Sequence, residues 1–340
     1  MTVRTALLGY GLAGRVIHRP LLVTEPGITV THVVTADPER RAQATDDLPD
    51  ARLLSRAEEL WSSAQEFDAV VVAAPNTVHV PLALTALDLG KATVVDKPVA
   101  LTVDDARLLI DRADDRGVPL SAFHNRRWDS DTLTARRLLA EGRLGEVVRL
   151  ESRFARFRPE VAQRWREDAA AGGGVLLDLG THVVDQALHL LGPAVDVYAE
   201  VDVRRAGGSA DDDVFLALTH TSGARSHLWC SMTAPASLPR LVLQGSQAGW
   251  AKDGLDGQED AQRRGHALPR EPAGRLWDVE GEHAHPSEQG DWGAYYRGFV
   301  AAVTTGTPVP VDAADAVRVL QVLDAARTSA HERTVVPVDA

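Results

Sequence analysis

The feature that most restricts how this chain folds is the run Gly9-x-Gly11-x-x-Gly14 near its N-terminus. It directly follows the apolar residues Ala6-Leu7-Leu8 and opens Arg15–Val23, where apolar residues recur at helical spacing. In such a strand–turn–helix unit the first glycine permits a tight turn, the second lets a pyrophosphate approach the backbone, and the third lets the helix pack closely on the strand. The pyrophosphate then lies at the helix N-terminus, where N–H groups are free. A purely structural tight turn is the alternative. The residues expected to bind a dinucleotide here are Gly9, Tyr10, Gly11, Leu12, Ala13 and Gly14.

Strands and helices alternate through the first third of the chain. The apolar, largely β-branched runs that predict buried strands are Val3–Leu8, Thr29–Thr35, Ala69–Ala74, Thr93–Val95 and Pro119–Phe123. The stretches between them with helical spacing are Arg15–Val23, Pro38–Asp46, Ala57–Ala64, Val80–Leu89 and Val103–Arg116. Because this alternation requires parallel pairing, we predict a doubly wound Rossmann sheet in a first domain, residues 1–122.

The pattern changes after residue 122, which predicts a second, α+β domain over residues 123–340 with a large open, mostly antiparallel sheet. Its predicted strands are Val147–Phe157, Val195–Arg204, Asp213–Thr219, Ala224–Met232 and Arg240–Gly245. A helix within Gly172–Leu191 is expected to pack against the sheet, and Arg137–Glu141 to continue a helix that ends near Gly142. Gly254–Gln289 is polar and predicts a long excursion with little core. Ala313–Arg327 predicts an amphipathic helix that packs on either domain.

Composition excludes several classes of protein. The 340 residues carry a net charge of −12 without a long basic run, so we expect no nucleic-acid partner. No stretch approaches about 18 apolar residues, so we expect no membrane span, and the N-terminus lacks the features of a secretion signal, which favours a cytoplasmic location. Cys230 is the only cysteine, which rules out an intrachain disulfide and a cysteine-based zinc site; we expect no metal.

The end of the second predicted strand bears on the choice between NAD and NADP. An acidic residue there would pair with the adenosine ribose and repel a 2′-phosphate. The tip is instead Thr35 followed by Ala36, and Asp37, before Pro38, either caps the next helix or reaches the ribose. With Arg40 and Arg41 nearby, we favour NADP while keeping NAD open.

Lysine is rare in this chain, at Lys91, Lys97 and Lys252 only. Lys97 immediately follows a predicted strand, at the sheet edge where ligands of open parallel sheets bind, and Pro98 keeps it extended. An ammonium group there can hydrogen-bond a substrate hydroxyl and stabilise the alkoxide that develops as hydride leaves. A surface lysine in a turn is the alternative.

Asp178 and His182 are four residues apart, and therefore on one face of a helix. Histidine is the usual proton acceptor near neutral pH, and an aspartate one turn away either orients it or binds a neighbouring substrate hydroxyl. Gly172-Gly173-Gly174 lets the preceding chain approach another group closely. The alternative is that His182 is only a packed residue without a chemical role. We expect such a structural role for His189 and for Asp185.

Together these motifs resemble the Gfo/Idh/MocA oxidoreductase family over essentially the whole chain. The segments that carry the resemblance are the Gly9–Gly14 run, Ala74-Pro75-Asn76-Thr77-Val78-His79, Asp96-Lys97-Pro98 and Gly172-Gly173-Gly174 with Asp178-x-x-x-His182. Two further segments are similar to the branch that contains NADP-dependent scyllo-inositol dehydrogenase: Phe123-His124-Asn125-Arg126-Arg127-Trp128 and Arg164-Trp165-Arg166. The family most often has Glu-Lys-Pro, so Asp96 is a conservative departure.

The resemblance implies a definite chemistry. His182 would be the general base, Lys97 would polarise the substrate oxygen, and Asp178 would bind the adjacent hydroxyl or orient the base. The cofactor-binding residues it implies beyond the glycine run are Thr35, Ala36, Pro75, Asn76, His79, Asp96, Lys97, Asn125 and Trp165. The substrate-binding residues are Lys97, His124, Asp178 and His182. For Asn76 a helix-capping role is the alternative.

We therefore expect hydride transfer between nicotinamide C4 and a secondary alcohol or ketone of an inositol, sugar or related polyol. The alternatives are an NAD-dependent glycosidase that oxidises its sugar transiently and a non-catalytic nucleotide-binding sensor. Lys97 and His182 count against the sensor. Because an uncovered sheet face favours association, we also expect a homodimer or homotetramer formed through the C-terminal sheet.

Overall fold

The structure is a computed structural model that describes residues 2–162, 167–169 and 172–339. It divides into two compact units, which are described separately. The first unit comprises Met1–Asn125, Gln258–Leu268 and Asp291–Val317, and the second comprises Arg126–Gly257, Pro269–Gly290 and Arg318–Ala340. The predicted boundary at residues 122 and 123 is close to the end of the first segment, but it does not anticipate the two later segments of the first unit.

The first unit contains a six-stranded sheet in the order β3-β2-β1-β4-β5-β6, and every neighbouring pair is parallel. Its strands are β1 (Val3–Leu8), β2 (Ile28–Val34), β3 (Arg52–Leu54), β4 (Ala69–Val72), β5 (Ala92–Val95) and β6 (Leu120–Ala122). The central strands are rich in valine and are buried on both faces; all four residues of β4 have no exposed surface. The predicted doubly wound parallel sheet is confirmed, and only the three-residue β3 was not predicted.

The helices of this sheet follow its strands. The helical segments are η1 (Ala13–His18), α1 (Arg19–Thr24), α2 (Pro38–Asp47), α3 (Ala57–Trp61), η2 (Ala64–Glu66), η3 (Asn76–Val78), α4 (His79–Asp88) and α5 (Val103–Arg116). The start of α5 is fixed by Thr102, whose hydroxyl accepts a hydrogen bond from the N–H of Asp105, and the helix ends at Gly117 in a left-handed conformation. The segment η1 is a π-helical turn that continues directly into α1.

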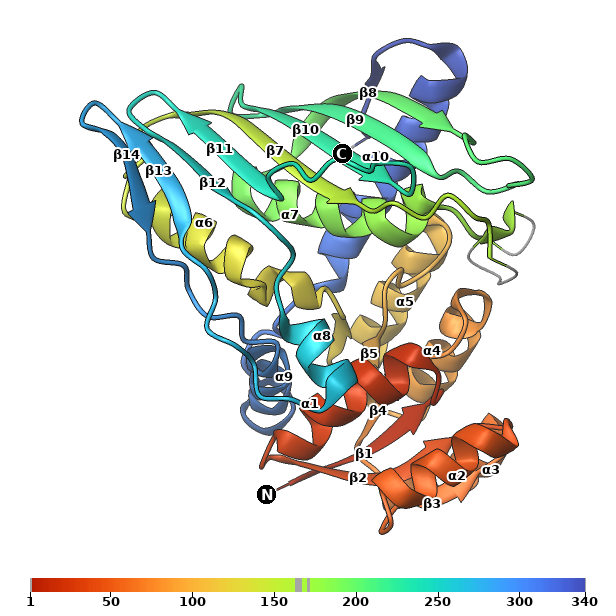
Figure 1. Ribbon diagram of the computed structural model, residues 1–340. Coiled ribbons are helices and arrows are strands. Elements are labelled where there is room, and N and C mark those ends of the chain that lie inside the picture. The colour runs from red at the N-terminus through yellow and green to blue at the C-terminus, as the bar shows by residue number, and fades with distance from the viewer. Residues whose placement is uncertain (1, 163–166, 170–171, 340) are drawn as a thin grey trace. The chain divides into compact units, whose positions relative to one another are not determined.

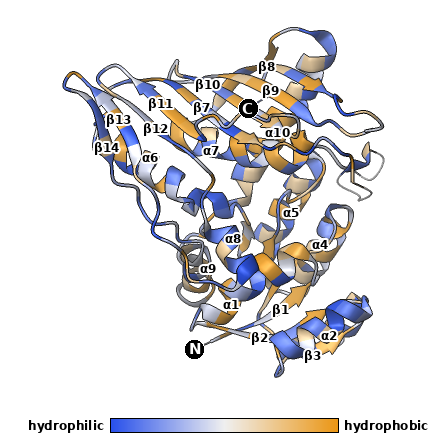
Figure 2. Ribbon diagram, in the orientation of Figure 1, coloured by the Kyte–Doolittle hydropathy of each residue, from blue (hydrophilic) through white to orange (hydrophobic). Residues whose placement is uncertain are grey.

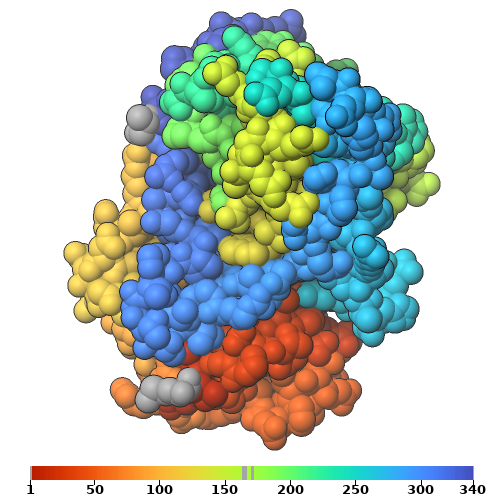
Figure 3. All heavy atoms as spheres, turned by 90° about the vertical axis from the view of Figure 1, so that its left-hand side faces the viewer, coloured from red at the N-terminus to blue at the C-terminus, as the bar shows by residue number. Residues whose placement is uncertain are grey.

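Two helices from the C-terminal half complete the first unit. They are α8 (Gln258–Arg264) and α9 (Gly293–Thr305), and neither was predicted from the sequence. In Figure 3 the blue 291–317 segment lies directly against the red N-terminal segment, and α9 packs on α1 and β1. Aromatic side chains of α9 therefore reach the core of the N-terminal sheet.

The second unit contains a nine-stranded sheet in the order β14-β13-β12-β11-β7-β10-β9-β8-β15. Only β7 and β10 pair in parallel, so the predicted mostly antiparallel sheet is confirmed. Its strands are β7 (Val147–Ala155), β8 (Ala194–Asp202), β9 (Asp213–His220), β10 (Arg225–Ser231), β11 (Leu241–Gly245), β12 (Gly249–Lys252), β13 (Gly274–Asp278), β14 (Gly281–His285) and β15 (Val336–Pro337). The last four strands were not predicted; β13 and β14 lie within the expected polar excursion.

One face of this sheet is covered by helices. In Figure 1, α6 and α7 lie along the same side of the strands, and in Figure 2 the strands alternate between hydrophilic and hydrophobic residues. In β9, for example, Val214, Leu216 and Leu218 are buried, whereas the residues between them are partly exposed.

The remaining helices are η4 (Asn125–Trp128), α6 (Ser130–Ala140), η7 (Leu176–Gly180), α7 (Thr181–Leu191) and α10 (Ala313–Glu332). Within the described part of the chain, no helix has both the length and the apolar character needed to cross a bilayer.

Candidate active site

The three glycines of the N-terminal turn meet different surroundings. Gly9 has a φ of +99°, and a methyl group on it would lie 2.3 Å from the carbonyl oxygen of Ala73. A methyl group on Gly14 would lie 2.1 Å from the carbonyl oxygen of Gly9, so the chain itself requires both glycines. A methyl group on Gly11 would meet nothing closer than the Arg40 guanidinium, 3.8 Å away. The turn therefore leaves space beside Gly11, as the approach of a pyrophosphate requires.

The side chain of Tyr10 anchors this turn. Its ring is buried, and its hydroxyl donates a 3.0 Å hydrogen bond to Asp47 at the end of α2, which also accepts one from Arg15 at 2.8 Å. Burial and the Asp47 carboxylate raise the pKa of Tyr10 well above its ordinary value, so the hydroxyl remains a donor. The Tyr10 side chain is thus engaged within the protein, whereas the Leu12 side chain is 44% exposed beside the turn.

The residues at and just after the end of β2 have different structural roles. Thr35 is buried, and Asp37 is the N-cap of α2, accepting a 2.9 Å hydrogen bond from the N–H of Arg40. Arg41 donates to the Thr35 carbonyl and to the hydroxyl of Ser55, 3.1 Å away. Arg40 alone of the two arginines lies beside Gly11, with its side chain exposed. The capping role of Asp37 is confirmed, and the residue near the glycine turn is a cation.

The segment after β4 contains Pro75, Asn76 and His79. The capping alternative for Asn76 is not observed, because the N-cap positions of η3 and α4 are Pro75 and Val78 and neither helix start has a side-chain cap. His79 is 1% exposed, and its Nδ1 and Nε2 each lie 2.8 Å from a carbonyl oxygen, those of Pro98 and Ala74. The structure thus places the His79 ring as a link between the loops that contain Ala74 and Pro98.

Lys97 follows the end of β5, where the sequence predicted it. Its N–H donates a 2.8 Å hydrogen bond to the Asp96 carboxylate, and both residues are partly exposed. The peptide bond between Lys97 and Pro98 is cis. Because the strands are parallel, the carboxyl ends of β1 and β5 lie at the same edge of the sheet, so Lys97 and the glycine turn share that edge.

Asp178 and His182 lie on adjoining helical segments of the second unit. Asp178 belongs to the π-helical turn η7 and His182 to the first turn of α7; four residues make about one turn in either geometry, so they share a face. His182 is 8% exposed, and its ring stacks near Phe154 with centroids 6.2 Å apart.

The start of this helical segment depends on a residue that the sequence did not single out. Asp211, just before β9, accepts a 2.6 Å hydrogen bond from the N–H of Leu176 at the N-terminus of η7. Gly174 has a φ of +124°, and a methyl group on it would lie 2.1 Å from the Asp211 carboxylate. The predicted close approach at Gly172-Gly173-Gly174 is therefore made to Asp211. The only signal in the sequence is the run Asp211-Asp212-Asp213, which indicates no partner by itself.

Other predicted residues are placed less fully. His124 and Asn125 follow β6 and are 1% and 6% exposed. Trp165, Arg164 and Arg166 lie outside the described residues. Apart from Trp165, the residues predicted to bind the cofactor belong to the first unit, as Lys97 does, whereas Asp178 and His182 belong to the second.

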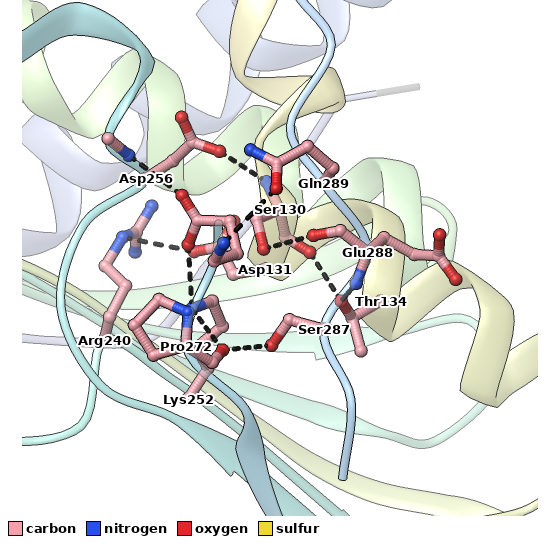
Figure 4. Close-up of polar contacts among 12 residues, drawn as sticks. Ser130, Asp131, Thr134, Arg240, Lys252, Asp256, Pro272, Ser287, Glu288 and Gln289 are labelled. Carbon is pink, nitrogen blue, oxygen red and sulfur yellow. Dashed lines mark hydrogen bonds and ion pairs between the residues drawn. The ribbon is translucent and has the colours of Figure 1, made fainter. Parts of the chain in front are cut away.

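The parts of the polar excursion that belong to the second unit, residues 254–257 and 269–289, are held there by buried polar contacts, shown in Figure 4. The ammonium group of Lys252 lies 3.0 Å from the Glu271 carboxylate, and both side chains are almost fully buried. Asp256 accepts a 2.8 Å hydrogen bond from the N–H of Ser130, whose hydroxyl donates to the Glu288 carbonyl at 2.6 Å. Lys252, one of three lysines, thus has a structural partner in the buried Glu271.

The parallel sheet, its glycine turn and a lysine at the same edge define a dinucleotide-binding oxidoreductase with a separate α+β unit. Two family models match the chain: an oxidoreductase family with an NAD-binding Rossmann fold over residues 3–124, and the GFO/IDH/MocA C-terminal domain over residues 132–251. The chain belongs to the Gfo/Idh/MocA family, and its cofactor is NADP or NAD.

Full-length relatives agree. The chain is 38% identical to the uncharacterized oxidoreductase YdgJ of Escherichia coli, over 97% of each chain. It is 33% identical to the scyllo-inositol 2-dehydrogenase (NADP(+)) IolW of Bacillus subtilis, over 99% of this chain and 96% of that protein. The structure of the putative oxidoreductase yvaA from Bacillus subtilis superposes with a TM-score of 0.93 at 32% identity, covering 100% of this chain and 99% of that one.

Proposed function

We propose that this oxidoreductase interconverts a secondary alcohol and a ketone on an inositol, sugar or related polyol, with NADP as cofactor. The observation that carries the proposal is Lys97 at the sheet edge that also bears the Gly9–Gly14 turn. A cation at that edge, beside a bound nicotinamide, would act on an oxygen rather than on a phosphate. The relative named for scyllo-inositol supports a polyol substrate.

The proposed roles account for every proton and electron. In the oxidative direction His182 accepts the proton of the substrate hydroxyl, and the Lys97 ammonium group donates a hydrogen bond to the oxygen as negative charge develops. When bound, the nicotinamide supplies the hydride acceptor at C4. Asp178 binds the adjacent hydroxyl or orients His182. Reduction of the ketone uses the same groups in reverse.

Turnover by purified protein tests these roles. Nicotinamide absorbance would be followed with NADP and NAD over a panel of inositols, aldoses and polyols. Lys97→Ala and His182→Ala are each expected to lower kcat about 100-fold or more, whereas Lys91→Ala, a matched loss of a lysine, is expected to leave kcat near wild type. Retained turnover in both site variants would overturn the roles. Glycoside hydrolysis without net change in the cofactor would favour the glycosidase, and cofactor binding without any reaction would favour the sensor.

The preference for NADP is proposed from Arg40. The Asp37 carboxylate caps α2. The group that lies beside Gly11 is the Arg40 guanidinium, which is a cation and not an acid. A cation there pairs with a 2′-phosphate, which only NADP has. Arg40→Ala is expected to weaken NADP binding about ten-fold and leave NAD binding nearly unchanged, measured by calorimetric titration. Arg56→Ala, which removes an exposed arginine of the same unit, is the control. Equal effects on both cofactors would contradict the assignment.

We also propose that two copies pair through the face of the second sheet opposite α6 and α7. This face carries partly exposed aromatic rings, among them Phe215 and Trp229, and the Arg153 guanidinium lies 4.1 Å from the Trp229 ring centroid. Arg153 also pairs with Glu151 at 2.6 Å. Charges of both signs around apolar rings suit a two-fold contact, in which the same patch meets itself. Light scattering should report a dimer or tetramer, and a monomer for Trp229→Glu; a monomeric wild type would contradict the proposal.

A further inference from the structure

His18 is a fully buried histidine that the proposed chemistry does not use. It ends the π-helical turn η1 and has no exposed surface. Its ring lies 4.1 Å from the ring of Phe123, centroid to centroid, and its Nδ1 is 2.6 Å from the hydroxyl of Tyr296 in α9. A histidine held on both sides in this way has one fixed ring orientation.

The other ring nitrogen of His18 faces Asp96. Nε2 lies 3.8 Å from one oxygen of the Asp96 carboxylate, which is longer than a hydrogen bond but still a close polar approach. The second carboxylate oxygen accepts the N–H of Lys97 at 2.8 Å. A continuous chain of polar groups therefore runs from Tyr296 through His18 and Asp96 to the main chain of Lys97, entirely within the first unit.

We propose that His18 is a positioning residue for Lys97, acting by holding the Asp96 carboxylate in the orientation that fixes the Lys97 main chain. The inference rests on the proposed function for the role of Lys97, and it adds two residues, His18 and Tyr296, that act on the reaction without touching the substrate. It also gives Asp96 a structural part beside its predicted contact with the cofactor.

Tyr296 and Asp96, the two polar partners of His18, have definite protonation states. Burial, together with the nearby Tyr295 and Asp96, raises the pKa of Tyr296 well above its ordinary value, so its hydroxyl keeps its proton beside Nδ1 of His18. Burial disfavours ionisation of Asp96, yet His18, His79 and Lys97 together hold the pKa of Asp96 below its ordinary value, so it accepts as a carboxylate.

Three variants test the chain of contacts through kinetics. His18→Phe keeps the ring but loses both nitrogens, His18→Gln keeps an N–H donor directed at Asp96, and Tyr296→Phe removes only the hydroxyl. Tyr295→Phe is the matched control, because the Tyr295 hydroxyl donates to Ser121 at 2.8 Å in the same helix environment. We expect His18→Phe to lower kcat about ten-fold, with the KM for NADP within about two-fold of wild type and partial recovery in His18→Gln.

A second readout needs no turnover. Protein labelled with ¹⁵N-lysine gives amide signals only from Lys91, Lys97 and Lys252, and Lys97→Arg identifies the Lys97 signal. His18→Phe and Tyr296→Phe should shift or broaden the Lys97 amide signal and leave the other two in place. Tyr295→Phe should move none of them.

The two readouts separate the inference from the proposed function. If wild-type protein oxidises no substrate, the proposed function fails, and the Lys97 amide signal still decides whether His18 positions that residue. An unchanged Lys97 signal in His18→Phe and Tyr296→Phe would overturn the inference, as would equal effects of Tyr295→Phe and Tyr296→Phe on kcat. If His18→Phe does not fold, the other two variants provide the test.

Discussion

The guanidinium group of Arg127 holds the carboxylate of Asp185 through contacts of 3.1, 3.0 and 2.5 Å, and both side chains are nearly fully buried. Asp185 lies three residues after His182 in α7. The ion pair therefore fixes the rotation of the helix that carries the proposed base. The sequence had indicated only a packed aspartate at this position.

Removing one charge of this buried pair should destabilise the protein strongly. Asp185→Asn removes the carboxylate charge that the buried Arg127 guanidinium contacts, and we expect a loss of about 3 kcal/mol in the free energy of unfolding, measured with urea. Asp260→Asn breaks an exposed ion pair with Arg264 and should cost less than about 1 kcal/mol. Equal losses in the two variants would show that Arg127–Asp185 does not hold α7.

Alanine at two glycines of the N-terminal turn should have different effects. Gly14→Ala places a methyl group against the Gly9 carbonyl and should lower the melting temperature, whereas Gly11→Ala meets only a flexible arginine and should fold normally. Gly11→Ala should nevertheless weaken NADP binding about ten-fold or more, because the methyl group occupies the space left for the pyrophosphate. Calorimetric titration and thermal unfolding measure the two effects. Normal NADP affinity in Gly11→Ala would contradict the predicted cofactor position.

Stability should depend on pH through Asp211. Burial raises the pKa of Asp211 above its ordinary value of 3.8, so the folded state favours the protonated form. That contribution is fully present below the unfolded pKa and is lost as pH rises through the folded pKa. Asp211→Asn keeps the acceptor for Leu176 N–H without a charge, so its stability relative to wild type should increase between pH 4 and pH 7. Urea unfolding at several pH values measures this; a constant difference would disagree.

The buried pair Lys252–Glu271 should show strong coupling. Lys252→Met leaves the Glu271 carboxylate buried without its partner and should cost about 3 kcal/mol of stability. Adding Glu271→Leu removes that unpaired charge and should restore part of the loss, which a double-mutant cycle of urea unfolding measures. If the two losses simply add, the pair is not the contact that holds the excursion.

The sequence was sufficient where local patterns set the structure. Short apolar runs marked five of the six parallel strands, and the helix Val103–Arg116 was predicted with its observed bounds. It was insufficient where a segment depends on a distant partner. β13 and β14 are short and polar and form strands only by pairing beside β12, and α9 completes the N-terminal unit from the other end of the chain.

In the candidate site, too, the residues in local motifs could be predicted, and those that depend on distant partners could not. Lys97, Asp178 and His182 stand in local motifs and could be named from the sequence. His18, Asp211 and Arg127 could not, since each acts through a residue 35 or more positions away, as Asp211 does on Leu176. No periodicity or spacing in one sequence reports such pairs.

The ends of the nine-stranded sheet bear on how this protein behaves at high concentration. One edge is the two-residue strand β15, which includes Pro337, and the other is β14, short and bearing Glu282 and two histidines. An edge strand with a proline, or with charged and short sequence, offers little template for another chain to extend the sheet. A long sheet that stops at such edges is protected against fibrous growth by edge-to-edge pairing.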